Sequence, residues 1–184
     1  MIFGWFTEEE AAFIINNFNA IPDVKGCIVE VGAYFGRSTV FFADNIPDTK
    51  IYSIDPWDNT IYARLNDRAY GGKHPIPADA YEQFLKNTAG FPNVIPLKGT
   101  SEFYAFTWTG GPIKLLFIDG CHTYEYVYKD WACWKGFIAQ GGLLCFHDCI
   151  GNWPDIVRTA DECERSGEFA VLGRGGSVKG FIKR

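Results

Sequence analysis

The residues best suited to bind a ligand occupy the short stretch EVGAYFGRS at positions 30–38. An apolar segment leads into Gly32, and Gly36 precedes a helical pattern. Glycine permits positive φ and the close approach of a ligand, while the first turn of a helix offers unpaired N–H groups. Asp55 ends the next apolar segment, 19 residues beyond Gly36, where a carboxylate can accept both hydroxyls of a ribose. Together these features predict an adenosine-containing ligand.

The glycine spacing narrows the identity of that ligand. Three residues separate the two glycines, including the bulky Tyr34 and Phe35, whereas a dinucleotide fingerprint reads G-x-G-x-x-G. An NAD-linked oxidoreductase is therefore a less favoured alternative. The chain has no Walker A loop and no G-x-S-x-G elbow, so neither a pyrophosphate nor a nucleophilic serine is indicated. The acidic Glu30 favours a ligand that carries a cationic group, and S-adenosylmethionine meets that requirement.

Two histidines near the ends of later apolar segments are candidates for acid–base catalysis. His122 follows Asp119 by three residues, and an imidazole titrates near neutral pH, as a general base requires. We therefore expect His122 to take the proton of an acceptor hydroxyl. His147, beside Asp148, is a second candidate, and a structural imidazole satisfied by the backbone is an equally good interpretation of it.

Alternating strands and helices are needed to bring these side chains together. The apolar periodicity predicts strands over residues 27–31, 50–55, 94–97, 114–119, 143–148, 169–172 and 177–182. It predicts helices over 8–19, around 38–42, 79–87, 102–108, from 124 to the glycine pair at 141–142, and 155–165. A capping box formed by Thr7 and Glu10 begins the first helix. The order is typical of an α/β Rossmann-like fold: a doubly wound, mostly parallel seven-stranded sheet, with an antiparallel C-terminal edge hairpin turning at 173–176.

Residues 56–78 do not follow this rhythm. The segment contains a glycine pair, a Pro-Ile-Pro sequence and several aromatic residues without a clear period. A connection longer than about 15 residues is commonly a functional lid. Because it follows the second strand, we expect it to cover the carboxyl edge of the sheet within a single domain spanning 1–184. A surface loop without a function is the alternative.

Composition limits the partners and the compartment. The chain has 184 residues, 47% hydrophobic and 21% charged, with no apolar run long enough to span a membrane. A net charge of −5 without a basic run argues against nucleic acid. The start of the chain lacks a secretory pattern and the six cysteines read as buried thiols, so we expect a cytoplasmic protein. The aromatic share of 17% predicts a pocket for a small ligand, and the apolar residues 2–6 suggest a homodimer contact.

Taken in order, the motifs resemble those of class I S-adenosylmethionine-dependent methyltransferases. The matching segments are Glu30-x-Gly32-x-x-x-Gly36-x-Ser38, Tyr52-x-Ile54-Asp55-Pro56-Trp57, Ile118-Asp119-Gly120-Cys121-His122-Thr123-Tyr124-Glu125 with Asp130, Gly141-Gly142 and Phe146-His147-Asp148. The chain is similar to the small bacterial subgroup related to macrolide- and sugar-modifying O-methyltransferases and the cephalosporin-hydroxylase group. This resemblance spans nearly the whole chain and implies methyl transfer to a hydroxyl of a small molecule or sugar.

The resemblance also implies which residues surround S-adenosylmethionine. Glu30 would lie near its ammonium group, and Asp55 would hold the ribose with Trp57 packed nearby. Thr100 and Ser101, which follow the third strand, would contact adenine. The implied cofactor-binding residues are Glu30, Gly32, Gly36, Ser38, Asp55, Trp57, Thr100, Ser101 and Asp119.

A magnesium ion is a further implication of the resemblance. Some relatives bind Mg²⁺ through the aspartate that ends the fourth strand and two residues after the fifth. Asp119 and Asp148 match two of these positions, whereas Cys149 stands at the third. A thiolate is a poor ligand for Mg²⁺, so the metal is an optional second cofactor here. The same departure leaves open a non-catalytic relative that binds the cofactor without transferring a methyl group.

Overall fold

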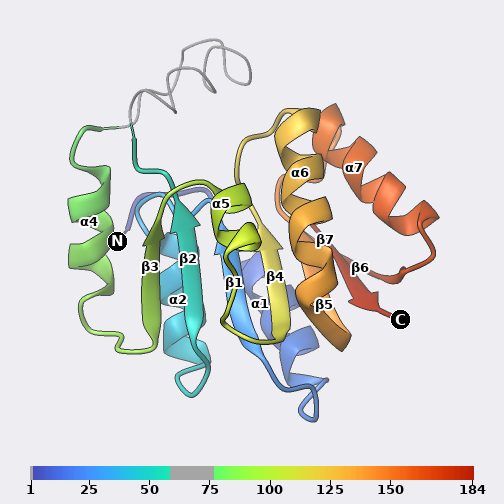
Figure 1. The fold of residues 1–184 in the computed structure, drawn as a ribbon, viewed down its shortest axis with the longest axis horizontal. Coiled ribbons are helices and arrows are strands. Elements are labelled where there is room, and N and C mark those ends of the chain that lie inside the picture. Colours follow the sequence, from blue (N-terminus) through green and yellow to red (C-terminus); the bar gives the residue numbers. More distant parts are fainter. Residues whose placement is uncertain (1, 59–76) are drawn as a thin grey trace.

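The structure is a computed structural model that describes residues 2–58 and 77–184, so most of the predicted lid at 56–78 lies outside the described residues. At its centre is a seven-stranded sheet with the strand order β3-β2-β1-β4-β5-β7-β6 (Figure 1). The strands are β1 (Cys27–Val31), β2 (Ile51–Asp55), β3 (Val94–Lys98), β4 (Ile113–Ile118), β5 (Ile138–Phe146), β6 (Phe169–Gly175) and β7 (Val178–Lys183). Strands β1 to β5 pair in parallel, and β7 is antiparallel to β5 and β6. The predicted Rossmann-like sheet with an antiparallel C-terminal hairpin is confirmed.

The central strands are apolar throughout because both faces of the sheet are covered. On β4, Leu115 and Phe117 join the core on one face, and Leu116 and Ile118 join the core on the other. Side chains of a strand alternate between faces, so a strand with two buried faces reads as a continuous apolar run.

Helices form a layer on each face of the sheet. They are α1 (Glu8–Asn19), α2 (Arg37–Asn45), α4 (Ala80–Thr88), α5 (Ser101–Phe106), α6 (Tyr124–Trp134) and α7 (Pro154–Arg165). Figure 1 shows α5, α6 and α7 in front of the sheet and α1 and α2 behind it. The predicted capping box of α1 is confirmed, because Glu10 Oε2 accepts the Thr7 N–H at 2.8 Å and Thr7 accepts the Glu10 N–H. None of these helices is long and apolar enough to cross a membrane.

The boundary between α6 and β5 differs from the prediction. The helix was expected to continue to the glycine pair at 141–142, but it ends at Trp134 and is followed by a short 3₁₀ turn, η1 (Lys135–Phe137). β5 already begins at Ile138, and the glycine pair lies inside it, where its pairing with β4 shifts register. Gly141 has φ +74, so the pair forms a strand irregularity and does not cap the helix.

The C-terminal hairpin is tighter than predicted. The expected turn at 173–176 is largely part of β6, which continues to Gly175. The chain reverses at Gly176 and Ser177, and Gly176 has the positive φ of +58 that a two-residue hairpin turn requires.

The carboxyl ends of the parallel strands meet at one edge of the sheet. There the N–H of Gly32 donates to the Ile54 carbonyl at 2.9 Å, and the N–H of Asp119 donates to the Val31 carbonyl at 2.8 Å. The strand order reverses at β1 and β4, which makes this edge the switch point where open α/β sheets bind ligands.

Candidate functional site

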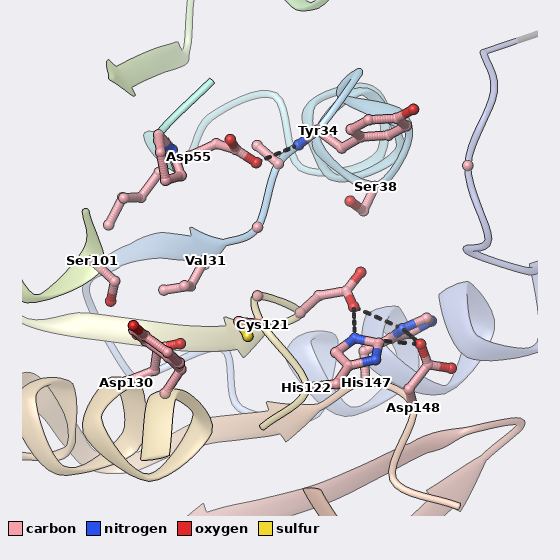
Figure 2. A pocket seen from close by; sticks show the side chains of 18 of the residues that line it. Val31, Tyr34, Ser38, Asp55, Ser101, Cys121, His122, Asp130, His147 and Asp148 are labelled. Atoms are coloured by element: carbon pink, nitrogen blue, oxygen red, sulfur yellow. Dashed lines mark hydrogen bonds and ion pairs between the residues drawn. The ribbon is translucent and has the colours of Figure 1, made fainter. Parts of the chain in front are cut away.

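A cavity of about 610 Å³ opens at the carboxyl edge of the sheet. It is lined by the N-terminal segment, by the turn after β1, by the ends of β2, β4 and β5, and by parts of α5 and α6. Its volume is within the range of small-molecule sites. Figure 2 shows two sets of polar residues on opposite sides of the cavity. The first set is Asp55, Ser101 and Asp130, and the second is His122, His147 and Asp148.

The turn between β1 and α2 is compact because it contains glycines. Gly32 lines the cavity with φ +93, and a Cβ at this position would overlap the backbone carbonyl of Asp119. Gly36 has φ +83 and initiates α2, with the Phe84 ring 3.0 Å from where its Cβ would lie. Both positions therefore need glycine, but only Gly32 faces the cavity.

Asp55 joins the end of β2 to this turn. Its Oδ2 accepts the backbone N–H of Tyr34 at 2.9 Å, and its Oδ1 accepts the N–H of Trp57 at 2.9 Å. Tyr34 and Trp57 have φ values of +45 and +41, a rare conformation for side chains of this size. The carboxylate lines the cavity within hydrogen-bond distance of the Gly32–Gly36 turn, where the sequence predicted it.

Trp57 does not line the cavity as predicted. Its indole N–H donates to the Tyr34 carbonyl at 2.7 Å, and its ring packs between Tyr81 and Phe84. The positive φ of Trp57 turns the chain away at the end of β2. Trp57 therefore supports the turn from behind, bonded through its N–H to Asp55, and does not itself line the cavity.

Glu30 also lies outside the cavity, which corrects its predicted place near an ammonium group. It is fully buried and accepts hydrogen bonds from Ser38 at 2.5 Å, from Ser53 at 2.8 Å and from Thr39. Burial raises the pKa of Glu30 to about 7, although the three hydroxyl donors oppose this rise. Among these partners only Ser38 lines the cavity, so Glu30 acts on the site by orienting that hydroxyl.

A cluster of two carboxylates and an imidazole forms the opposite side of the cavity. His122 Nε2 lies 3.7 Å from Asp119 Oδ1 and 3.6 Å from Asp148 Oδ2. The donor atoms of the three residues lie within 4.8 Å of one another. His122 is 8% exposed, and its ring meets the Trp153 ring edge to face. The predicted grouping of these residues from the ends of β4 and β5 is confirmed.

His147 lies behind this cluster, between three carboxylates. Its Nδ1 is 3.0 Å from Asp119 Oδ1 and 3.4 Å from Asp148 Oδ2, and its Nε2 is 3.4 Å from Glu10 Oε2. Burial alone would disfavour its charge, but the surrounding carboxylates outweigh burial and raise the pKa of His147 to about 12. An imidazole that keeps its proton is a poor general base, so the geometry favours a positioning role for His147.

Glu10 is a site residue that sequence analysis treated only as part of a helix cap. It is 3% exposed, and its Oε1 also accepts the N–H of Ser177 at 3.0 Å and the hydroxyl of Ser177 at 2.6 Å. Burial would raise the pKa of Glu10, but hydrogen bonds from His147, Ser177 and Thr7 hold it well below its usual range. Glu10 thereby ties the first turn of α1 to the β6–β7 hairpin and to the cavity.

The two predicted metal ligands, Asp119 and Asp148, lie together, and His122 lies with them where Cys149 does not. Cys149 is fully buried, and its sulfur lies 3.8 Å from the Arg174 guanidinium, whose other nitrogen donates to the Cys149 carbonyl. The thiol therefore belongs to the core, and His122 occupies the third position beside Asp119 and Asp148. Two carboxylates and an imidazole suit a divalent cation such as Mg²⁺ or Mn²⁺ better than a thiolate does.

The other side of the cavity contains the predicted adenine contacts and one further acid. Thr100 and Ser101 line it at the start of α5, and Asp130 of α6 lies with them. Ser101 Oγ accepts the indole N–H of Trp134 at 2.8 Å. The sequence analysis named Asp130 in a motif but gave it no role. Its position on the helix face that carries Val127 and the two tryptophans could have identified it as a buried acid.

The aromatic N-terminus contributes to the cavity. Phe3, Trp5 and Phe6 all line it. Phe3 and Trp5 are 60% and 59% exposed, and Phe6 is buried against Phe42 and Phe117. Arg37 fixes this segment by donating to the Gly4 carbonyl at 2.9 Å. These rings, which the sequence suggested for a dimer contact, thus form part of the pocket wall.

Comparisons with known proteins agree with this arrangement. A family model described as a methyltransferase domain matches residues 29–149, from β1 to the residues just after β5. The O-methyltransferase NovP shares 14% identity over 95% of this chain and 79% of its own length, with a TM-score of 0.74. The calicheamicin methyltransferase CalS11 shares 18% identity over 94% of this chain and 77% of its own, with a TM-score of 0.69.

A third similar structure contains a bound ligand. A Streptococcus mutans protein, described as a putative methyltransferase in complex with S-adenosylhomocysteine, shares 11% identity over 97% of this chain and 100% of its own length, with a TM-score of 0.65. At such identities these likenesses establish the fold.

Proposed function

The chain belongs to the methyltransferase domain family, and on this premise we propose that it moves a methyl group from S-adenosylmethionine to a hydroxyl of a small molecule or sugar. The resemblance to methyltransferases that the sequence indicated is confirmed, and the protein is an enzyme. The observation that carries the finer proposal is the position of Asp55, a buried carboxylate beside the Gly32 turn in the cavity that also holds Asp119, His122 and Asp148.

The β1–α2 turn and Asp55 would hold the cofactor. Each carboxylate oxygen of Asp55 uses one lone pair on a backbone N–H, which leaves further lone pairs for the two hydroxyls of a ribose. The absence of a side chain at Gly32 lets the end of β4 pack closely against the turn, which keeps the backbone of the turn at the cavity wall. Bound S-adenosylmethionine supplies an electrophilic methyl group on a cationic sulfur.

His122 would remove the proton from the acceptor. As the acceptor oxygen forms its bond to the methyl carbon, the carbon–sulfur bond breaks, its electron pair stays on sulfur, and the hydroxyl proton passes to His122 Nε2. Asp119 and Asp148 flank that nitrogen at 3.7 and 3.6 Å, so they help to orient the ring. The Trp153 ring packed against His122 limits the positions that the imidazole can adopt.

Asp119 and Asp148 would also hold a divalent cation. Their carboxylate oxygens lie within 4.8 Å of each other, which is compatible with one ion held by the two carboxylates, while His122 Nε2 acts as the base. When bound, such an ion supplies positive charge that lowers the pKa of an acceptor hydroxyl.

The remaining expectations concern setting and partners. We expect the acceptor to be a small hydroxylated molecule and not a nucleic acid, because the chain carries a net charge of −5 without a basic run. The six cysteines all lie among the described residues and form no disulfide, which suits a reducing compartment such as the cytoplasm.

Calorimetric titration with S-adenosylhomocysteine tests the proposed cofactor. Binding to the wild type should be clear, and Asp55→Ala should weaken it at least about tenfold through the lost ribose contacts. Asp48→Ala, which removes an exposed carboxylate elsewhere, should leave the affinity unchanged. Absence of binding to the wild type would overturn the proposal. Transfer of labelled methyl to a panel of phenols, sugars and polyketide alcohols would then identify the acceptor.

A further inference from the structure

The residue that follows His147 has an uncommon backbone conformation at the edge of the cavity. Asp148 has φ +51, in the left-handed region. Aspartate enters this region more readily than most residues, yet it needs surrounding contacts to remain there. The Asp148 carboxylate lines the cavity, and its Oδ2 lies 3.6 Å from His122 Nε2 (Figure 2). The contacts that hold the backbone of Asp148 therefore bear on the proposed reaction.

The C-terminal hairpin provides these contacts. Ser177 lies in the turn between β6 and β7, and its hydroxyl oxygen accepts the backbone N–H of Asp148 at 3.2 Å. The Ser177 carbonyl accepts the N–H of Cys149 at 2.9 Å. Arg174 of β6 donates to the Cys149 carbonyl. The hairpin thus engages both N–H groups and one carbonyl of the Asp148–Cys149 dipeptide.

Glu10 fixes the direction of the Ser177 hydroxyl. This hydroxyl has a single hydrogen, which it donates to Glu10 Oε1 at 2.6 Å. Its oxygen lone pairs are then left to face the Asp148 N–H, so the two hydrogen bonds support each other. Glu10 is buried and also accepts the backbone N–H of Ser177 at 3.0 Å, which holds the serine in place.

These supporting residues come from outside the part of the chain that the methyltransferase domain model matches. The match covers residues 29–149, so it contains Asp148 near its end, whereas Glu10 precedes it and Ser177 follows it. Neither Glu10 nor Ser177 is among the described residues that line the cavity. Any effect of the Ser177 hydroxyl on methyl transfer must therefore pass through a neighbour, and Asp148 is the cavity residue to which it is bonded.

We propose that the Ser177 hydroxyl is a positioning group: oriented by Glu10, it holds Asp148 in its left-handed conformation. The Asp148 carboxylate is thereby directed toward Asp119 and His122, where the proton transfer and the cation binding are proposed to occur. The inference rests on the proposed function, because it assigns Ser177 to the transfer step. Cofactor affinity should not depend on Ser177, since the ribose site at Asp55 uses other contacts.

Ser177→Ala and Ser177→Thr test this assignment, because the first removes the hydroxyl and the second retains it. Ser177→Ala should lower kcat about tenfold or more and reduce the rise in melting temperature with Mg²⁺ or Mn²⁺, as expected when a group that orients a metal ligand is lost. Its calorimetric affinity for S-adenosylhomocysteine should stay within about twofold of the wild type. Ser177→Thr should restore kcat and the metal response. A kcat in Ser177→Ala equal to that of the wild type would overturn the inference.

Lys183→Met provides a control for loss of stability. Lys183 lies on β7 and donates to the carbonyls of Lys135 and Ile138 at 2.8 Å, so its loss loosens the same hairpin without removing a contact to Asp148. This variant should melt at a lower temperature and keep kcat within about twofold of the wild type. If Lys183→Met lowered kcat as much as Ser177→Ala, the hairpin would act through stability alone and the inference would be wrong.

A crystal structure of Ser177→Ala gives a readout that does not depend on turnover. We expect Asp148 to change from φ +51 to a negative φ and its carboxylate to move away from His122. An Asp148 that keeps its conformation in this variant would overturn the inference and leave the proposed function intact. Failure of the wild type to bind S-adenosylhomocysteine would overturn the proposed function, and the variant structure would still decide whether Ser177 positions Asp148.

Discussion

Asp55 Oδ2 lies 2.9 Å from the backbone nitrogen of Tyr34, so the acid at the end of β2 is bonded directly to the glycine turn that follows β1. The bond joins the ends of the neighbouring strands β2 and β1, and the order of the sheet reverses on the other side of β1, between β1 and β4. It fixes the carboxylate at the wall of the cavity and holds Tyr34 at a positive φ. The fold itself therefore places this carboxylate where the proposed ribose would bind.

Replacing His122 should separate catalysis from cofactor binding. We expect His122→Gln to lower kcat by about 10²–10⁴-fold, because the proposed base for the acceptor proton is lost. The calorimetric affinity for S-adenosylhomocysteine should stay within about twofold. The measurement is a steady-state assay with the acceptor found in the methyl-transfer panel. An equal loss of kcat and of cofactor affinity would show that His122 supports the pocket instead.

A divalent cation should stabilise the enzyme through Asp148. Binding to the folded state alone raises the melting temperature by mass action, so Mg²⁺ or Mn²⁺ should raise that of the wild type. Asp148→Asn should remove the response, because a carboxylate is lost from the cluster with Asp119 and His122. Asp48→Ala should retain it. Melting temperatures with and without metal measure this response independently of catalytic turnover. Equal responses in the two variants would mean that the ion binds elsewhere.

Glu10 should contribute strongly to stability. Glu10→Gln leaves buried His147 without one of its charged partners and weakens the bonds to Ser177, which should cost about 2–4 kcal/mol in urea unfolding at pH 7. Glu9→Gln, an exposed neighbour on α1, should change stability by less than about 0.5 kcal/mol.

The pH dependence of that difference has a defined sign. The folded pKa of Glu10 lies below its ordinary value of 4.5, so its ionised form contributes stability at higher pH. The gap between wild type and Glu10→Gln should shrink as the pH falls below 4.5. A gap that widens in acid would contradict the burial of an ionised Glu10.

Asp130 should destabilise the folded protein as the pH rises. Its pKa is about 7 when folded against an ordinary 3.8, so the folded state holds a proton that the unfolded state releases between these values. Stability should therefore fall by up to about 1.4 kcal/mol per pH unit across this window. Glu102 faces Asp130 from α5, and Lys129 precedes Asp130 on α6. Both residues are present in the wild type and in the variant with which it is compared, so the difference between the two proteins reports on Asp130.

Asp130→Asn should lack this component, so its stability relative to the wild type should increase from pH 5 to pH 7 and then level off. Urea unfolding of both proteins at pH 5, 6, 7 and 8 measures the difference. Parallel profiles for the two proteins would mean that Asp130 is ionised across the whole range.

The strands and most helices were predictable because their signals are local. Segments 27–31 and 51–55 are short and mostly apolar, and each is followed by turn-forming residues. Each can therefore be recognised as a strand from its own residues. The glycine pair at 141–142 was misread because a strand irregularity is defined by pairing with β4, which lies outside the local pattern. Asp55 was placed correctly because it directly follows a recognisable strand.

The errors in the site share one cause. Glu30 and Trp57 were assigned to the ligand from their position in motifs, but their partners come from other elements, such as Ser53 for Glu30 and Phe84 for Trp57. Likewise the role of His147 depends on Glu10, which is distant in sequence and arrives with α1. Side-chain direction and long-range partners require the assembled fold.

The most direct measurement of the central claim is a crystal structure of the enzyme with S-adenosylhomocysteine. We predict that the 2′ and 3′ hydroxyls of its ribose lie about 2.5–3.0 Å from the carboxylate oxygens of Asp55. A ligand bound in the cavity with its ribose hydroxyls held by other residues, or bound away from the Gly32 turn, would contradict the account.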